Sequence, residues 1–232
     1  MPRNTLTREQ IVRTAVDLLD EEGLEGLNMR NLGKRLDSAA TAVYWHVKNK
    51  DDLVLLAGDL VWHEIALPEE PVDRAHWRTA AVDLAVGLRA MFGRHPWLVQ
   101  AFGSHLFHGP GKARYDDHCL ALHEAAGFAP ADADRIAAAV FTQVLGAALG
   151  DAAEVSLDRR LRRDGRDPQE QLDATMARAV EVAREFPRLR ARLDGPEALD
   201  YAAAPGAEFE EALRALLDGL AARLGGGPDA RR

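Results

Sequence analysis

The sequence predicts an all-α protein, and three observations indicate this fold class. Apolar residues recur at intervals of three and four along most of the chain, as on the buried side of an amphipathic helix. No segment alternates apolar and polar residues as a half-buried strand does, and glycine and proline fall near the ends of the helical segments. We expect an N-terminal helical domain over residues 1–50, a larger helical domain over 51–224, and a disordered tail over 225–232.

The first helix is expected to begin after Thr7 and to end at Gly23. Thr7 and Gln10 have the spacing of a capping box, in which each side chain bonds to the main chain of the other residue. Glycine is common where a helix ends because it tolerates a left-handed conformation. One apolar stripe on this helix consists of Ile11, Ala15, Leu18 and Leu19.

The segment NMRNLGKRLDSAATAVYWHVKNK, residues 28–50, predicts two short helices joined by a turn at Asp37 and Ser38. In the second helix Val43 and Val47 follow Ala39 at intervals of four, so these three residues are expected to face inward. A helix of roughly ten residues is about 15 Å long and fits the DNA major groove, which is about 12 Å wide.

The opposite side of this segment combines small side chains, hydrogen-bonding groups and positive charge. Its candidate DNA-binding residues are Arg30, Ala40, Thr41, Tyr44, Trp45, His46, Lys48 and Lys50. Small side chains let a helix approach base edges, while hydroxyl, imidazole and ammonium groups reach phosphates. The alternative is an ordinary amphipathic helix pair with a solvated basic side, and exposed aromatic residues beside lysines speak against it.

The larger domain is expected to contain helices at 51–66, 75–93, 96–106, 112–127, 131–153, 169–185 and 206–224. The helix over 75–93 has the clearest buried stripe, formed by Trp77, Ala81, Leu84, Leu88 and Met91. The charged stretch 154–170 contains Gly165 and Pro168 and is predicted to be a mobile loop. Its arginines could instead form a protein-interaction surface, but they alternate with aspartates.

Charge is distributed unevenly along the chain. The formal net charge is −8, yet residues 26–50 carry five basic residues and one acidic residue, and residues 1–16 carry three basic residues and one acidic residue. Because DNA responds to the local field, the N-terminal domain can still bind it. The single cysteine, Cys119, excludes an internal disulfide and suits the cytoplasm.

Several classes of protein are not expected. The N-terminus lacks the apolar core of a signal peptide, and no run of 18 uninterrupted apolar residues predicts a membrane-spanning helix. The chain contains no HExxH or GxSxG motif and no phosphate-binding glycine loop after a strand, so we do not expect an enzyme.

Aromatic, histidine and methionine side chains in the middle of the larger domain could line a small-molecule pocket. The candidate ligand-binding residues are His63, Met91, Trp97, Phe102, His105, Phe107 and Phe141, although an ordinary core is the usual explanation for most residues of this kind. His105 and His108 have a helical spacing that could hold a metal, but no third ligand is suitably spaced. We therefore expect no metal and no cofactor.

The stretch from Thr7 to Leu53 resembles the N-terminal domain of the TetR family, through EEGLEGLNMRNLGKRL followed by TAVYWHVKNKDDL. The run from Tyr44 to Lys50 is especially similar to the tetracycline repressors. The resemblance implies a helix-turn-helix and assigns DNA contacts to Arg30, Thr41, Tyr44, His46 and Lys50. Asp37 stands where a glycine is usual, and Ala40 replaces a longer polar residue, so the recognised operator should differ.

The stretch HWRTAAVDLAVGLRAMFGRHPWL resembles the body of the same repressors. Leu84 and Phe102 stand where polar or histidine ligands of tetracycline would be expected, so the effector should be more apolar than tetracycline. The resemblance also implies a homodimer in which the last two long helices pair with those of a second copy. Without the resemblance, these helices could be ordinary core helices.

The function implied is a transcriptional regulator, expected to be a repressor that a small, largely apolar molecule releases from a palindromic operator. In a dimer the two recognition helices would lie roughly 34–36 Å apart, one turn of DNA. The alternative is a DNA-binding regulator without a small-molecule effector.

Overall fold

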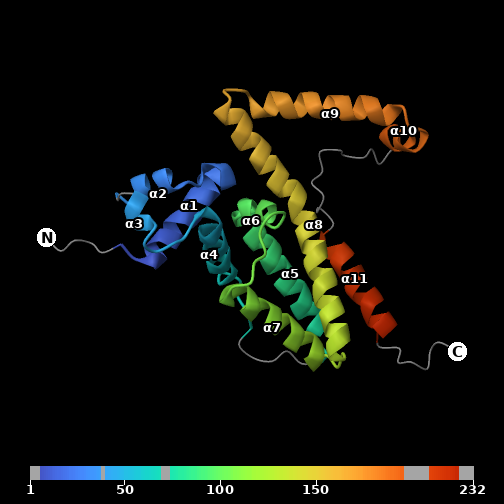
Figure 1. Cartoon of the computed structure of the whole chain (residues 1–232). Helices are drawn as coiled ribbons and strands as arrows, with labels where there is room; N and C mark the ends of the chain where they lie inside the picture. Colours follow the sequence, from blue (N-terminus) through green and yellow to red (C-terminus); the bar gives the residue numbers. More distant parts are fainter. Residues whose placement is uncertain (1–5, 38–39, 69–73, 196–208, 225–232) are drawn as a thin grey trace.

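A computed structural model describes residues 6–37, 40–68, 74–195 and 209–224, and every regular element within these ranges is a helix (Figure 1). The all-α prediction is therefore confirmed. The N-terminal head, a name used here for residues 6–50, contains three helices: α1 (Arg8–Gly26), α2 (Met29–Arg35) and α3 (Ala40–Val43). Helix α4 (Lys50–Trp62) leads from the head into the body, the rest of the described chain.

The body contains seven further helices. They are α5 (Trp77–Arg94), α6 (Pro96–Ala101), α7 (Pro110–Ala125), α8 (Pro130–Arg163), α9 (Pro168–Arg184), α10 (Pro187–Leu193) and α11 (Phe209–Leu224). Helices α6 to α10 each begin with a proline, whose missing N–H and fixed φ suit the first helical position. The predicted tail, 225–232, lies outside the described residues.

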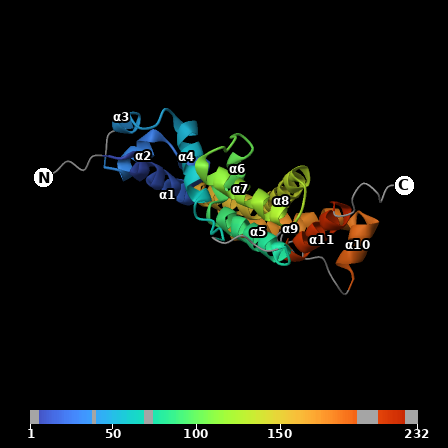
Figure 2. The ribbon, with the colours of Figure 1, turned by 90° about the horizontal axis from the view of Figure 1, so that it is seen from below.

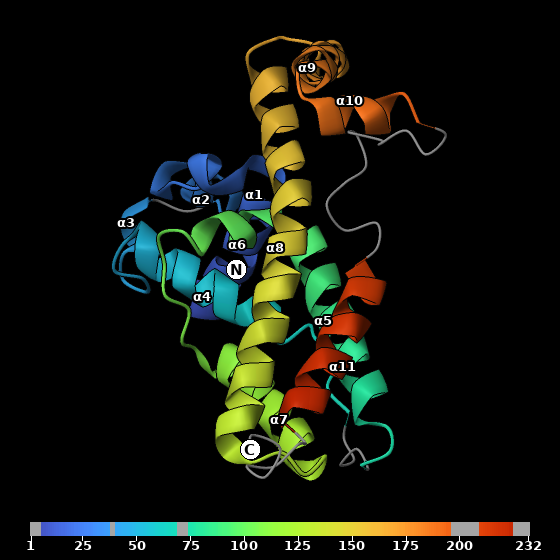
Figure 3. The same cartoon turned by 90° about the vertical axis from the view of Figure 1, so that its right-hand side faces the viewer.

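Helix α8 is the long axis of the body, with α5, α6, α7 and α11 packed against it (Figure 3). Its 34 residues span about 50 Å. It is also the one described helix that is long and apolar enough to cross a membrane, with a mean hydropathy of 1.5 over its best window. Because α8 packs against four neighbouring helices, it serves as a core helix of the body.

The prediction of a mobile loop over 154–170 is wrong for most of its length, because α8 continues to Arg163. An ion pair between Arg162 and Asp158 supports this last part of the helix. Arg163 also pairs with Glu25 of α1 at 2.8 Å, so the charged stretch packs against the head. Helix α9 then projects away from the body and is followed by α10, which was not expected from the sequence (Figures 1 and 2).

Other predicted boundaries need smaller corrections. The short helix expected over 96–106 ends at Ala101, and the fourth helix ends at Trp62 instead of Ala66. After Trp62 the main chain continues in tight turns, in which Glu64 N–H bonds to the carbonyl of Val61 at 3.0 Å. Helix α1 passes Gly23, whose φ of 70° produces a kink, and continues to Gly26. The predicted capping box at Thr7 is confirmed.

Candidate DNA interface and effector pocket

The segment predicted to bind DNA has a shorter helix than the sequence suggested. Helix α3 comprises four residues, Ala40–Val43, and the chain then turns through positions 44–46, where His46 N–H bonds to the Val43 carbonyl at 2.9 Å. Val43 and Val47 are fully buried, as their spacing predicted. Ser38 and Ala39 lie outside the described residues, as do the side chains of Ala40 and Thr41.

The turn after α3 presents two aromatic side chains to solvent. Trp45 is 88% exposed and Tyr44 is 54% exposed, whereas other large apolar side chains of the head are buried or half-buried. Arg30 and Lys48 are also exposed, and His46 is half-buried. Exposed aromatic and cationic groups are suited to contacts with phosphates and sugars.

Lys50 is in a different situation from Lys48. Its Nζ donates to the carbonyl of Leu24 at 2.6 Å, which ties the start of α4 to the end of α1. Lys50 is nevertheless an exposed residue. The predicted DNA contacts of these residues stay predictions, and Lys50 has in addition a structural role.

The turn between α2 and α3 shows why a glycine is usual there. Asp37 has a φ of +47°, the one described non-glycine residue in the left-handed region. Aspartate tolerates this conformation better than most residues with a Cβ, because its short polar side chain can bond locally. The departure at Asp37 therefore preserves the shape of the turn.

A cavity of about 280 Å³ lies in the body between α5, α7 and α8. Its wall is mostly apolar, with a few ionisable groups from α7 and α8. The lining residues are Ala81, Leu84, Lys112, Tyr115, Asp116, Cys119, Leu120, Leu122, His123, Asp134, Ala137, Ala138, Val140 and Phe141. An apolar wall with a few converging polar groups is typical of a small-molecule site.

The polar groups of this pocket are concentrated on α7. The Lys112 ammonium pairs with Asp116 and lies 5.5 Å from the ring centroids of both Trp62 and Phe141. His123 is 3% exposed, and neither of its ring nitrogens has a hydrogen-bond partner. A buried polar group without a partner is costly, so a ligand that supplies one would be favoured.

Burial sets the protonation of the remaining groups in the pocket. It lowers the pKa of His123, which favours the neutral imidazole. It raises the pKa of Cys119 to about 11 and that of Tyr115 above its usual range, so both groups are neutral near pH 7. The wall of the pocket is therefore mostly neutral, and Lys112, Asp116 and Asp134 are its charged side chains.

The predicted ligand residues are dispersed. Phe141 lines the cavity, whereas Met91 and Trp97 are fully buried in the core. Phe107 is 9% exposed, and its ring centroid lies 5.0 Å from that of Phe102. His63 is exposed. Of the seven predicted residues, Phe141 alone lines this cavity, and the other six, His63, Met91, Trp97, Phe102, His105 and Phe107, do not.

The candidate metal pair is occupied by other contacts. His105 lies 2.9 Å from Ser104 and 3.4 Å from Asp51, and His108 bonds to the carbonyl of Leu106. The described residues include no group of three or more side chains placed to hold a metal ion.

The sequence reasoning missed most of the pocket because it emphasised large aromatic residues. Lys112, Asp116, Cys119 and His123 lie at intervals of three or four along α7 and form one face of that helix. That spacing was visible in the sequence, but mixed polar and apolar residues on a helix face usually mark its solvent boundary. The packing of α5 and α8 against this face made it a pocket wall.

Comparison with known proteins agrees with this architecture. Residues 67–224 match the family described as tetracyclin repressor-like, C-terminal domain, and residues 11–57 match bacterial regulatory proteins of the tetR family. An HTH-type transcriptional regulator of Saccharopolyspora erythraea is 38% identical over 141 residues, which cover 61% of this chain and 59% of that protein. The tetracycline repressor protein class C of Escherichia coli is 29% identical, over 94% of this chain and 91% of the relative.

Solved structures show the same relationship over nearly the full length. The TetR family protein ActR of Streptomyces coelicolor, in complex with actinorhodin, has a TM-score of 0.76 and 27% identity, covering 97% of this chain and 99% of that chain. The same protein in complex with (S)-DNPA has a TM-score of 0.69 and 29% identity, over 95% and 99%. Because the two family matches together account for most of its length, the chain belongs to the TetR family of bacterial regulatory proteins.

Proposed function

We propose that this protein is a cytoplasmic transcriptional regulator, most simply a repressor, that binds a palindromic operator as a homodimer and leaves it when a small, largely apolar aromatic molecule occupies the body pocket. One observation carries the proposal. A head with exposed Tyr44 and Trp45 is joined by a single helix, α4, to Trp62, whose ring packs against pocket residues Tyr115 and Phe141. TetR-family regulators are not enzymes, and no catalytic role is proposed.

The head supports the DNA-binding part of this proposal. The predicted contact residues Arg30, Tyr44, Trp45 and Lys48 are all exposed and lie in or between α2 and α4. Arg30 and Lys48 carry positive charge, whereas the chain as a whole has a formal net charge of −8. Such a distribution attracts DNA to the head and limits adhesion elsewhere.

Helices α8 and α11 support dimerisation. On α11 the exposed positions Ala212, Ala215 and Gly219 share one face, and α8 exposes Gly146 and the 54% exposed Leu149. A Cβ added at Gly146 or Gly219 would meet no atom within 4 Å. Small residues on exposed helix faces let a second helix pack closely, as the paired helices of a twofold bundle require.

The size of the pocket limits the effector. Its 280 Å³ lie just below the range of about 300–1,000 Å³ usual for small-molecule sites, so a compact ligand fits best without rearrangement. This small size also favours the alternative, a regulator without a small-molecule effector. The ligand-bound structures of ActR, which shares this fold, favour an effector.

The mechanism follows from differential affinity. An effector can release DNA only if it binds the DNA-free arrangement more tightly than the DNA-bound one. A difference of about 2.7 kcal/mol weakens DNA binding roughly a hundredfold. Ligand in the pocket would press on Trp62 and so shift α4, which changes the separation of the two heads.

A shift assay with the DNA upstream of the gene tests the proposal. Lys48→Ala should weaken binding and lower the slope of log affinity against log salt by about 0.9, the value for one phosphate contact. Arg178→Ala, an exposed arginine of α9, is the matched control and should leave the slope unchanged. If the slope of log affinity against log salt is the same for Lys48→Ala, Arg178→Ala and the parent protein, Lys48 does not contact DNA and the proposed DNA-binding surface is wrong.

The effector part needs a separate test. Actinorhodin and (S)-DNPA serve as probes, because they occupy the relative ActR. Either should displace DNA from the parent protein but not from Ala137→Phe, which fills the cavity while the head is untouched. If the filled variant responds like the parent, the pocket is not the effector site. If neither probe acts on the parent, the alternative without an effector is favoured.

A further inference from the structure

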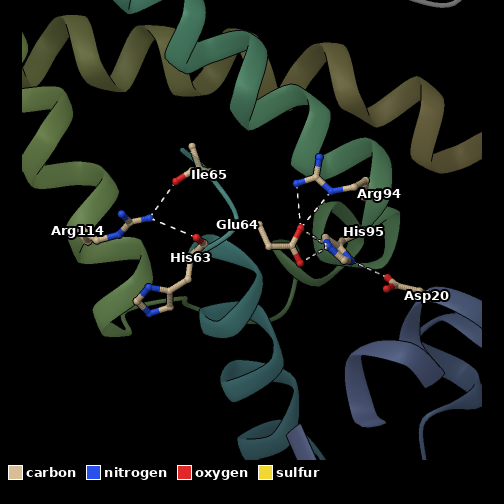
Figure 4. A network of polar contacts seen from close by, with 7 residues as sticks. All are labelled: Asp20, His63, Glu64, Ile65, Arg94, His95 and Arg114. Atoms are coloured by element: carbon tan, nitrogen blue, oxygen red, sulfur yellow. Dashed lines mark hydrogen bonds and ion pairs between the residues drawn. The ribbon is translucent and has the colours of Figure 1, made fainter. Parts of the chain in front are cut away.

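The head is attached to the body by a histidine that contacts two carboxylates on different elements. His95, between α5 and α6, lies with Nδ1 2.8 Å from Asp20 of α1 and with Nε2 3.1 Å from both carboxylate oxygens of Glu64, just after α4 (Figure 4). We call Asp20, His95 and Glu64 the clamp. His95 is 5% exposed, so water does not compete freely for these bonds.

The geometry of the clamp identifies its charge state. An ionised carboxylate only accepts hydrogen bonds, and a neutral imidazole has one donor and one acceptor nitrogen. His95 can satisfy Asp20 and Glu64 at the same time only when both of its nitrogens carry a proton. The clamp is complete with the imidazolium, and losing the proton removes one of the two bridges.

Neighbouring groups hold the two carboxylates in place. Trp97 Nε1 donates to Asp20 Oδ1 at 2.7 Å, and Arg159 of α8 donates to the Asp20 carbonyl. On the other side Arg94 donates to Glu64 Oε2 at 2.9 Å and 3.1 Å. The charged groups that face His95 are therefore Asp20 and Glu64, with Arg94 and Arg159 bonded to them.

The same segment of chain is connected to the pocket. Arg114 of α7 donates from Nη2 to the carbonyl of Ile65 at 2.9 Å, and the carbonyl of His63 lies at 3.5 Å from the same nitrogen (Figure 4). The pocket residues Lys112 and Tyr115 flank Arg114 on this helix. Residues 63–65 thus lie between the pocket helix on one side and the clamp on the other.

We propose that His95 is a positioning residue that holds the DNA-binding head against the body in its protonated form, and that Arg114 connects this clamp to the pocket helix α7. A displacement of α7 then reaches α1 through residues 63–65 and His95, in addition to any movement of α4. This extends the proposed function, because it supplies a second connection between effector and head.

Acidity should control the clamp. Burial alone would lower the pKa of His95, but the carboxylates of Asp20 and Glu64 outweigh burial and raise it. A raised folded pKa means that the stabilisation is present in full below the ordinary histidine pKa and is lost as the pH rises through the folded value.

Hydrogen exchange of the full-length protein, without DNA or effector, tests the proposal. Amides in the turn of α1 around Asp20 and in α6, which packs against it, should lose about tenfold protection between about pH 5.5 and pH 8.5, after correction for intrinsic rates. In the variants His95→Gln and Glu64→Gln, the same amides should be weakly protected from exchange at both pH values. His108→Gln, an exposed histidine with a local contact, is the control and should follow the parent protein.

The connection to the pocket is tested in the same way. Arg114→Met should reduce protection around Asp20 as well as in residues 63–65, and Arg114→Lys, which can still donate to one carbonyl, should restore part of it. Protection that is independent of pH in the parent protein overturns the clamp. Loss confined to residues 63–65 in Arg114→Met overturns the connection.

These outcomes do not depend on operator or effector binding. Failure to bind upstream DNA would refute the proposed function while the pH-dependent protection remained, so the two proposals fail separately.

Discussion

Asp59 should be a major source of the stability of the pocket helix. Helix α7 has Gly109 at its N-cap and no capping bond from that residue. Asp59 of α4 replaces it: Oδ1 accepts from Gly111 N–H at 2.7 Å and Lys112 N–H at 3.4 Å. Gly111 permits this approach, since a Cβ there would lie 2.3 Å from the Asp59 carbonyl oxygen.

Two contributions set the loss of stability expected for Asp59→Ala. Removing a capping side chain costs about 1 kcal/mol, and losing a negative charge at a helix N-terminus costs roughly 0.3–1 kcal/mol more. Asp59→Ala should therefore lower the free energy of unfolding by about 1.3–2 kcal/mol. For a chain of 232 residues, that corresponds to a fall in Tm of roughly 3–8 °C.

Thermal unfolding followed by circular dichroism measures this effect. Asp59→Asn keeps an acceptor oxygen but not the charge, so it should lose only about 0.5 kcal/mol. Asp83→Ala, on the exposed side of α5, is the control and should change stability by less than about 0.5 kcal/mol. If Asp59→Ala is no less stable than these two variants, Asp59 does not cap α7 and the α4–α7 contact has another basis.

Two other substitutions test the local geometry. Asp37→Gly should raise the free energy of unfolding by about 0.5 kcal/mol in urea titrations, because it relieves the cost of φ +47°, whereas unchanged or lower stability would indicate that the Asp37 side chain stabilises this turn. Gly58→Ala should lower Tm by an amount corresponding to about 1–3 kcal/mol, because its Cβ would lie 2.2 Å from the Phe107 ring. Gly93→Ala, with open space around its Cβ, should not lower Tm, and equal losses at both glycines would contradict the packing argument.

The sequence was sufficient for the features that depend on local order. The capping box at Thr7, the buried pair Val43 and Val47, and the position of most helices follow from periodicity and capping, and the structure has them. The last part of α8 was not predictable in this way. Its charged side chains look solvated in the sequence, and they are ordered by bonds to α1, which is about 140 residues distant.

The pocket was difficult to predict for a related reason. The residues of its wall are determined by the packing of helices that are distant in the sequence. The sequence alone does not show that α5 and α8 cover the face of α7 that carries His123. Trp97, one of the large aromatic residues expected in the pocket, lies in the core instead, where its indole N–H donates to Asp20. His123 is different because its nitrogens are buried without partners, a property that only three-dimensional packing reveals.

Helix α4 and the turn after it make three contacts that connect the head and the body. Asp59 holds the start of α7, Trp62 packs on pocket residues, and Glu64 reaches the head through His95. A ligand that displaced α7 by a small amount would act on all three contacts at once, because each involves α4 or the turn that follows it. Close-packed contacts of this kind transmit a displacement instead of absorbing it. For that reason variants at Asp59 and His95 should alter the response of the head to the pocket more than they alter the intrinsic affinity of the exposed surface around Trp45 for DNA.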